Sequence, residues 1–191
     1  MNCANQMVES GRIFFQPSNI DIHQKMPVVE NNWAVIDMQN LNKCVGYKIQ
    51  WKRFRKYLKE GLNVTRAIIF MGFLKENMSL YECLERAGFV LHFRKVRKLE
   101  DGTIDGGNCD ADLTTFTMDR KNEFNRVILI ADDGDYCAMV KSLVRQDKLK
   151  LIISSHSINK TSELIKEVVP RNLIMSINSL RNQIEYKKIA A

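Results

Sequence analysis

Several features are missing from this sequence, and each absence excludes a class of protein. No stretch approaches the roughly 18 unbroken apolar residues that a membrane-spanning helix needs. The N-terminus also lacks the basic region and apolar run of a secretory leader. We therefore expect a soluble, cytoplasmic protein without a membrane partner.

The motifs of several enzyme classes are absent as well. There is no Gly-x-x-x-x-Gly-Lys loop and no Gly-x-Gly-x-x-Gly after an apolar run, so nothing favours a bound nucleotide cofactor. The three histidines lie far apart, and none belongs to a recognisable nucleophile turn. The five cysteines form none of the close pairs that zinc sites use. We interpret Cys83, Cys109 and Cys137 as small buried hydrophobes and assign no cysteine a chemical role.

Positive charge dominates one segment. The formal net charge is +7, and residues 43–59 hold seven lysines and arginines without an acid. Within them Tyr47, Trp51, Phe54 and Leu58 recur at helical spacing, which predicts a helix with an apolar stripe and a basic opposite face. Because a surface of one sign attracts polyanions through counterion release, nucleic acid is the leading partner class. The residues that we expect to contact phosphates are Lys48, Lys52, Arg53, Arg55 and Lys56.

Six short apolar runs alternate with amphipathic stretches. The runs are residues 33–36, 67–71, 89–91, 127–130, 149–153 and 173–175. Such a pattern is typical of a parallel sheet that helices cover on both faces. We therefore expect residues 33–191 to form one α/β domain, a three-layer α/β/α sandwich with a central parallel sheet. Residues 1–32 show no sustained period and are interpreted as an N-terminal extension.

Aspartates follow two of these runs at the point where each ends. Asp37 comes directly after the first run, and Asp133 and Asp135 follow the fourth, with Asp132 beside them. The carboxyl ends of parallel strands share one edge of a sheet, where ligands bind in open α/β folds. If the two strands are neighbours, Asp37 and Asp133 converge on one pocket.

A third acidic pair, Asp110 and Asp112, opens a segment that we interpret as a helix, residues 110–119. Side chains two positions apart on a helix point about 200° apart, so only one of the pair can aim at the shared pocket. We prefer Asp110. Each aspartate taken singly is also a common helix cap, and Asp133 stands where an N-cap would stand. Three acidic sites at one sheet edge, beside a basic helix, nevertheless favour metal binding.

Clustered carboxylates repel one another unless a cation neutralises them. Oxygen ligands without nearby histidine or cysteine favour Mg²⁺ or Mn²⁺. Such an ion polarises a phosphodiester and lowers the pKa of bound water for in-line attack. The sequence thus predicts Mg²⁺ or Mn²⁺ as cofactor, and the expected metal-binding and catalytic residues are Asp37, Asp110, Asp133 and Asp135.

Three blocks contain these acids: Val35-Ile-Asp-Met-Gln-Asn-Leu41, Gly107-Asn-Cys-Asp-Ala-Asp-Leu113 and Ile130-Ala-Asp-Asp-Gly-Asp-Tyr136. In order and spacing they resemble the signature of the NYN domain family within the PIN-like nuclease superfamily. The resemblance implies a PIN-like fold and a Mg²⁺- or Mn²⁺-dependent ribonuclease. It assigns metal binding to Asp37, Asp110, Asp133 and Asp135, and it assigns Asn40 to their support.

The chain departs from the family pattern at four positions, Met38, Gly107, Asp132 and Tyr136. These departures keep a second hypothesis open, a catalytically weak or inactive RNA-binding or regulatory module of the same fold. A third, a phosphohydrolase of small compounds, ranks last because Gln39 replaces the second aspartate of an Asp-x-Asp nucleophile motif. RNA is the expected partner. The sequence leaves a homo-oligomer and a regulatory protein partner open.

Overall fold

A six-stranded sheet forms the centre of the protein in the computed structural model, which describes residues 30–100 and 104–187. The strand order is β3-β2-β1-β6-β7-β8, and every pair of neighbours is parallel. The strands are β1 (Asn32–Asp37), β2 (Val64–Phe73), β3 (Val90–Lys95), β6 (Val127–Ile130), β7 (Leu149–Ser154) and β8 (Ile174–Ser176). All six expected strands and the α/β class are confirmed.

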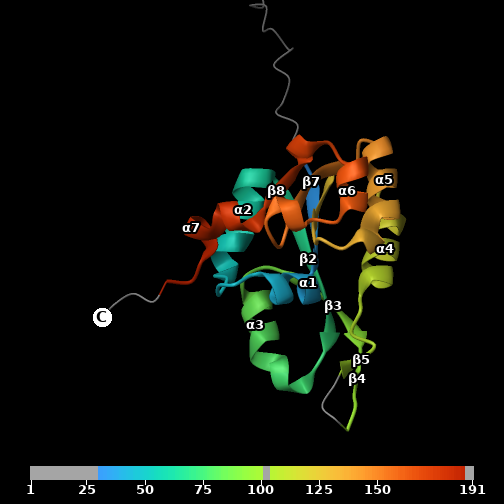
Figure 1. The fold of residues 1–191 in the computed structure, drawn as a ribbon. Coiled ribbons are helices and arrows are strands. Elements are labelled where there is room, and N and C mark those ends of the chain that lie inside the picture. The colour runs from blue at the N-terminus through green and yellow to red at the C-terminus, as the bar shows by residue number, and fades with distance from the viewer. Residues whose placement is uncertain (1–29, 101–103, 188–191) are drawn as a thin grey trace, which may run out of the picture.

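Helices cover both faces of this sheet, as expected for its continuous apolar strands (Figure 1). One face carries α2 (Trp51–Leu62), α3 (Met78–Arg86) and α7 (Arg181–Ile184). The other carries α4 (Asp110–Asp119), α5 (Cys137–Arg145) and α6 (Glu163–Val168). Successive residues of β1 alternate between two cores: Ala34 and Ile36 pack on the α2 side, and Trp33 and Val35 on the α4 side.

The elements near residue 43 differ from the expectation. A short helix, α1 (Met38–Cys44), follows β1 directly, and α2 begins only at Trp51, where the side chain of Gln50 accepts from the backbone N–H of Arg53. Tyr47 and Lys48 therefore precede the helix that they were expected to join. The helix also extends past residue 59, so Glu60 contributes an acid that lies 3.8 Å from Lys56 Nζ.

Other elements follow the sequence pattern more closely. The helix expected over residues 110–119 is α4, with the same bounds. Helix α5 is preceded by the 3-10 turn η2 (Gly134–Tyr136), and α7 is preceded by η5 (Ile177–Leu180). The short hairpin β4 (Arg97–Lys98) and β5 (Ile104–Asp105) has no counterpart in the expected elements. Further 3-10 turns are η1 (Lys75–Asn77), η3 (Ile158–Lys160) and η4 (Arg171–Leu173).

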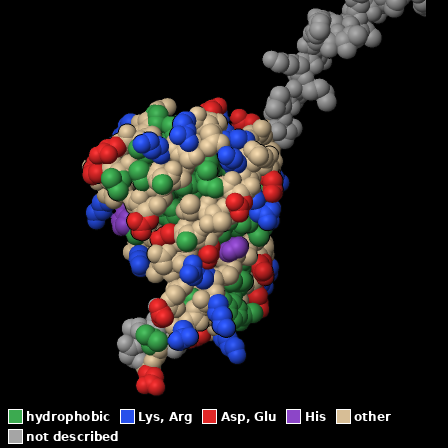
Figure 2. All heavy atoms as spheres, turned by 90° about the vertical axis from the view of Figure 1, so that its right-hand side faces the viewer, with side chains coloured by type: hydrophobic (Ala, Val, Ile, Leu, Met, Phe, Trp, Pro, Cys, Tyr) green, Lys and Arg blue, Asp and Glu red, His purple; other side chains and the backbone are tan. Residues whose placement is uncertain are grey.

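Charged side chains occur on both sides of the sheet. On the face that carries α4, α5 and α6, acidic and basic side chains are interspersed (Figure 2). Helix α2, whose sequence holds Lys52, Arg53, Arg55 and Lys56, lies on the opposite side of the sheet (Figure 1). The expected extension, residues 1–32, falls outside the described residues except for Glu30, Asn31 and Asn32, and Asn32 already belongs to β1. None of the described helices has the length and apolar character to cross a membrane.

Candidate metal centre

The order of the strands reverses its direction between β1 and β6. The chain moves from β1 outward through β2 to β3, and then returns to place β6 on the other side of β1. In open parallel sheets, such a reversal opens a crevice at the carboxyl ends of the two central strands. Asp37 is the last residue of β1, and Asp133 comes three residues after the end of β6. The strands β1 and β6 are parallel neighbours, which is the condition that the expected convergence of Asp37 and Asp133 required.

Asp37 is buried, with 6% of its surface exposed. The alternation along β1 turns its side chain toward the α4 face, as for Trp33 and Val35. Its Oδ1 accepts the backbone N–H of Asn40 at 3.0 Å and caps α1, and its Oδ2 accepts the hydroxyl of Tyr136 at 3.0 Å. Burial raises the pKa of Asp37, the two hydrogen bonds oppose that shift, and the nearby charge of Asp110 adds to it.

Three further aspartates gather beside this residue. One carboxylate oxygen each of Asp110, Asp133 and Asp135 lies within 4.8 Å of the others. Asp133 accepts the backbone N–H of Asp135 at 3.2 Å, so it caps η2 as its position suggested. Capping occupies one oxygen of Asp37 and one of Asp133, and it holds both carboxylates in place. Because a carboxylate has two oxygens, capping and metal binding are compatible in these residues.

Tyr136 connects Asp37 to this cluster. Its fully buried hydroxyl lies 2.5 Å from Asp110 Oδ1 and 3.0 Å from Asp37 Oδ2. Burial, followed by the charges of both aspartates, strongly raises the pKa of Tyr136, so the hydroxyl keeps its proton. A single proton serves only one carboxylate at a time. The role of Tyr136 at this site was not predicted, because its apolar neighbours indicated an ordinary core residue. Its hydroxyl was the only feature that indicated a polar role.

The donor set suits a hard divalent cation. The four side chains offer only carboxylate oxygens, which Mg²⁺ and Mn²⁺ prefer. Asn40, in the first turn of α1, adds a buried amide oxygen that has no hydrogen-bond partner among the described residues. An unpartnered buried acceptor is costly, and a cation or its water would satisfy it. Asp37, Asp110, Asp133 and Asp135, with Asn40 in support, therefore fit such an ion.

Two neighbouring aspartates, Asp112 and Asp132, lie outside this cluster. Asp112 Oδ2 forms an ion pair with Arg94 at 3.2 Å. Asp132 is buried, and it accepts the backbone N–H of Ser155 at 2.7 Å. Asp110 and Asp112 have different surroundings because residues two positions apart on a helix lie on different faces. Asp132 and Asp133 have different surroundings because successive side chains of an extended segment point to opposite sides.

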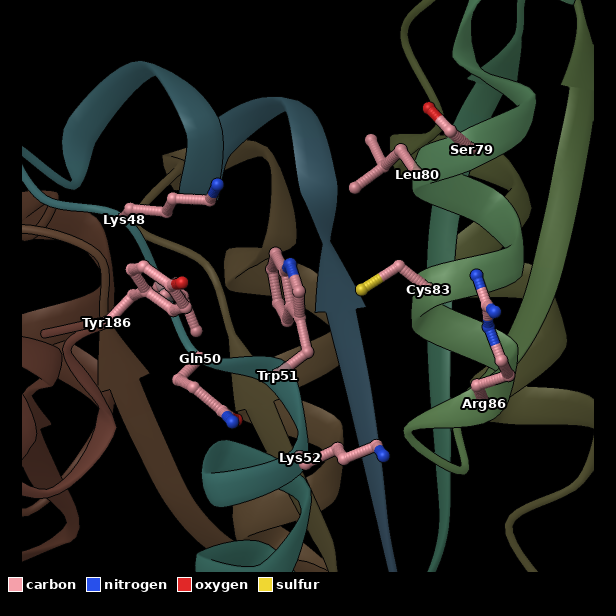
Figure 3. Close-up of a pocket in the computed structure, with 10 residues that line it drawn as sticks. Lys48, Gln50, Trp51, Lys52, Ser79, Leu80, Cys83, Arg86 and Tyr186 are labelled. Atoms are coloured by element: carbon pink, nitrogen blue, oxygen red, sulfur yellow. The ribbon is translucent and has the colours of Figure 1, made fainter. Parts of the chain in front are cut away.

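The basic residues are divided among three places. Lys48 and Lys52 line a cavity of about 570 Å³, the α2–α3 cavity, with Trp51, Arg86 and Tyr186 (Figure 3). Lys48 Nζ also lies 5.1 Å from the centre of the Tyr186 ring. Arg53 and Lys56 line a shallower hollow farther along α2, together with Glu60.

Arg55 has a structural environment. Its guanidinium donates to the backbone carbonyls of Gly88, Val64 and Thr65 at 3.0, 3.2 and 3.0 Å. Three hydrogen bonds from one planar group tie α2 to the start of β2 and to the turn before β3. These hydrogen bonds favour a structural role for Arg55 over contact with phosphate.

A second cavity lies between α1, β2 and α3. This α1–β2 cavity encloses about 350 Å³, and its lining includes Met38 and Gln39, which directly follow Asp37. Lys43 and Asn77 add polar groups to the same lining. Leu80 borders both cavities, so they adjoin each other. The sequence pattern gave no sign of these cavities, because their walls come from distant segments.

The cysteines only partly follow the expectation. Cys109 is buried in the core beside α4, with 4% of its surface exposed. Cys137 is half-buried, and Cys83 is exposed in α3, where it lines the α2–α3 cavity. The interpretation of Cys83 as a buried hydrophobe is therefore wrong, because it lies on the solvent side of its helix.

One of the solved structures that are similar to this chain shares its fold. A protein of unknown function from Vibrio parahaemolyticus is 17% identical, with a TM-score of 0.62 over 78% of this chain and 94% of that one. A mutant of the T5 5′-exonuclease is 15% identical, with a TM-score of 0.42 over 69% of this chain and 52% of that one. A structure of divalent metal ions (zinc) bound to T5 5′-exonuclease is also 15% identical, with a TM-score of 0.42 over 69% of this chain and 57% of that one.

No curated protein sequence matches the chain. The sequence model of the NYN domain family, by contrast, matches residues 32–174. This range extends from the first strand of the sheet to the start of the last strand. This range contains all four clustered aspartates and most of the central sheet. The chain belongs to the NYN domain family.

Proposed function

We propose that the protein is a Mg²⁺- or Mn²⁺-dependent ribonuclease that hydrolyses phosphodiester bonds with an activated water. The supporting observation is the cluster of Asp110, Asp133 and Asp135, which Tyr136 connects to Asp37 at the carboxyl end of β1, in a chain of the NYN family. Carboxylates so close to one another need positive charge, and an open cluster of this kind can share a cation with a phosphate.

The aspartates of the site have different roles in this proposal. A divalent cation supplies charge that polarises the phosphodiester and activates water. Asp110, Asp133 and Asp135 form the solvent-facing side of the cluster and would hold the cation where RNA can reach it. Asp37 is fixed by Asn40 and Tyr136, and it would bind the cation from the buried side. The capping hydrogen bonds keep these acids from rearranging during the reaction.

The RNA strand, in this proposal, runs from the acids through the α1–β2 cavity into the α2–α3 cavity. Lys43, Lys48, Lys52 and Arg86 provide positive charge along that path. The indole of Trp51 and the ring of Tyr186 line the far cavity, where bases can stack on aromatic surfaces. Arg53 and Lys56 lie farther along α2 and would contact a longer strand.

Cleavage assays test the proposal directly. The full chain is incubated with end-labelled single-stranded RNA, or DNA of the same sequence, in Mg²⁺, Mn²⁺ or a chelator. We expect metal-dependent cleavage of RNA that Asp133→Asn reduces at least about a hundredfold. Asp119→Asn, an exposed aspartate at the far end of α4, is the matched control and should cleave as the wild type does. No cleavage, or equal cleavage by Asp133→Asn, would refute the proposal.

One observation favours a second function, an RNA-binding module with little or no catalysis. The Tyr136 hydroxyl lies between Asp37 and Asp110 and provides these carboxylates with a hydrogen-bond donor without a cation. This alternative predicts that RNA binds equally well in Mn²⁺ and in chelator and is never cut. It also predicts that substitution of Lys48 and Lys52 weakens binding whereas Asp37→Asn does not.

A further inference from the structure

A second group of potential metal ligands lies outside the four-carboxylate cluster. Ligand atoms of Cys44, Asp132 and His156 all lie within 4.8 Å of one another. Cys44 is the last residue of α1, Asp132 follows β6, and His156 follows β7. Three distant segments thus bring a thiol, a carboxylate and an imidazole to one point.

The surroundings orient the carboxylate. Asp132 Oδ2 accepts the backbone N–H of Ser155 at 2.7 Å, and Oδ1 accepts the hydroxyl of Thr161 at 3.4 Å. The same Oδ2 lies 3.2 Å from Nδ1 of His156. Outer hydrogen bonds of this kind fix the ligating groups of protein metal sites and raise their affinity.

The ligand atoms are accessible enough for an ion to enter. Asp132 is almost fully buried, but 31% of the His156 side chain is exposed and Cys44 is half-buried. Burial, and then the charge of Asp132, raises the pKa of the Cys44 thiol, so a bound cation must displace the thiol proton to solvent. The three groups form a half-open site with its carboxylate at the base.

We propose that Cys44 Sγ, Asp132 and His156 Nδ1 bind a borderline-soft divalent cation of the Zn²⁺ class, with water in the remaining position. Sulfur, imidazole and carboxylate together are ligands of Zn²⁺, whereas Mg²⁺ and Mn²⁺ prefer the all-oxygen cluster. The chain would therefore hold two sites of different selectivity. The ion would tie the C-terminal end of α1 to the loops after β6 and β7, which none of the assigned nuclease roles requires.

Cobalt absorption provides the test, since a cysteine thiolate bound to Co²⁺ gives a charge-transfer band in the near ultraviolet that an all-oxygen site lacks. The full chain is stripped with a chelator, supplied with excess Mg²⁺ to fill oxygen sites, and titrated with Co²⁺ and then with Zn²⁺. We expect one equivalent of Co²⁺ to produce the band and Zn²⁺ to abolish it. Cys44→Ser should remove the band and weaken Zn²⁺ binding at least about tenfold.

Matched variants separate this site from other cysteines and from the nuclease. Cys83→Ser replaces an exposed cysteine outside the cluster and should keep the band. Asp133→Asn should also keep it, so the two proposals fail independently. Should Cys44→Ser not fold, His156→Asn changes a partly exposed side chain and should give the same loss of Zn²⁺ affinity. A band that persists in Cys44→Ser, an unchanged Zn²⁺ affinity in His156→Asn, or folded wild-type protein that gives no band would overturn the proposal.

Discussion

The Tyr136 hydroxyl donates a hydrogen bond to Asp110 Oδ1 across 2.5 Å. The same oxygen lies 3.0 Å from Asp37 Oδ2, so the hydroxyl stands between two carboxylates that both belong to the candidate metal centre. Because the hydroxyl has one proton for two acceptors, the negative charge of one of the two carboxylates is only partly balanced. The hydroxyl therefore stabilises the metal-free cluster and competes with a cation for it.

Substitution of Tyr136 by phenylalanine separates these two effects. In chelator, Tyr136→Phe should lower the free energy of unfolding by about 1–3 kcal/mol, because the buried Asp37 and the half-buried Asp110 lose their shared hydrogen-bond donor. Added Mn²⁺ should then raise the melting temperature more in the variant than in the wild type. Thermal unfolding followed by circular dichroism, with and without Mn²⁺, measures both changes. An equal response to Mn²⁺ in the two proteins would show that the hydroxyl does not compete with the cation.

The raised pKa of Asp37 gives the metal site a pH dependence. A carboxyl whose folded-state pKa lies above its ordinary value of 3.8 favours folding below that value, and the contribution is lost as pH rises through the folded-state pKa. At neutral pH the buried charge thus opposes folding. In chelator, Asp37→Asn should be more stable than the wild type at neutral pH and lose that advantage in acid. Unfolding midpoints across the pH range measure it, and an advantage that does not change with pH would contradict this interpretation.

The same pKa governs cation binding. Protons compete with Mn²⁺ for Asp37, so the apparent Mn²⁺ affinity of the wild type should decline as pH falls through the raised pKa of this residue. Isothermal titration with Mn²⁺ at a series of pH values measures the decline. If Mn²⁺ affinity begins to fall only near the ordinary carboxyl value, Asp37 is not a ligand of that ion.

Gly134 controls the spacing of two acids. It lies between Asp133 and Asp135 in η2, and an added Cβ would lie 2.7 Å from Ser162 Oγ. Gly134→Ala should therefore displace η2 and lower nuclease activity by about tenfold to a hundredfold, with a stability change of at most about 1–3 kcal/mol. Combining it with Ser162→Gly removes the contacting oxygen and should restore most of the activity. Cleavage rates that the second substitution leaves unchanged would argue against the steric cause.

Arg55 is expected to stabilise the fold rather than bind RNA. Lysine cannot reproduce the three hydrogen bonds from its guanidinium to Gly88, Val64 and Thr65. Arg55→Lys should therefore cost about 1–3 kcal/mol of unfolding free energy while RNA affinity stays unchanged. Urea unfolding and filter binding measure the two quantities. A large loss of RNA affinity in folded Arg55→Lys would return this residue to the phosphate-binding surface.

Lys48 and Lys52 are expected to contact phosphates. The double variant Lys48→Gln/Lys52→Gln should weaken RNA binding, and the slope of log affinity against log salt should become shallower by about 1–2, because fewer counterions are released. The control is Lys141→Gln, an exposed lysine on α5 at the opposite face of the sheet. Fluorescence anisotropy at several salt concentrations measures the slopes. Equal slopes in the double variant and the wild type would exclude both lysines.

Local pattern alone predicted the sheet. The central strand β6 is covered on both faces, so each of its residues is apolar, and a continuous run such as Val127 to Ile130 is visible without a structure. The hairpin of β4 and β5 was missed because strands of two residues leave no periodicity to detect. The start of α2 was misplaced because Tyr47 continues the apolar spacing of the helix although it lies before the cap at Gln50.

The sequence by itself determined the α/β class and the sheet edge at which Asp37 and Asp133 meet, because both follow from apolar runs and from the shared direction of parallel strands. Only the tertiary structure decided which neighbouring acids join them. Asp112 pairs with Arg94, and Asp132 with a loop that follows β7, whereas Tyr136 reaches Asp37 across 99 positions in the chain. Such contacts depend on which side chains distant segments bring together, and no local pattern records them.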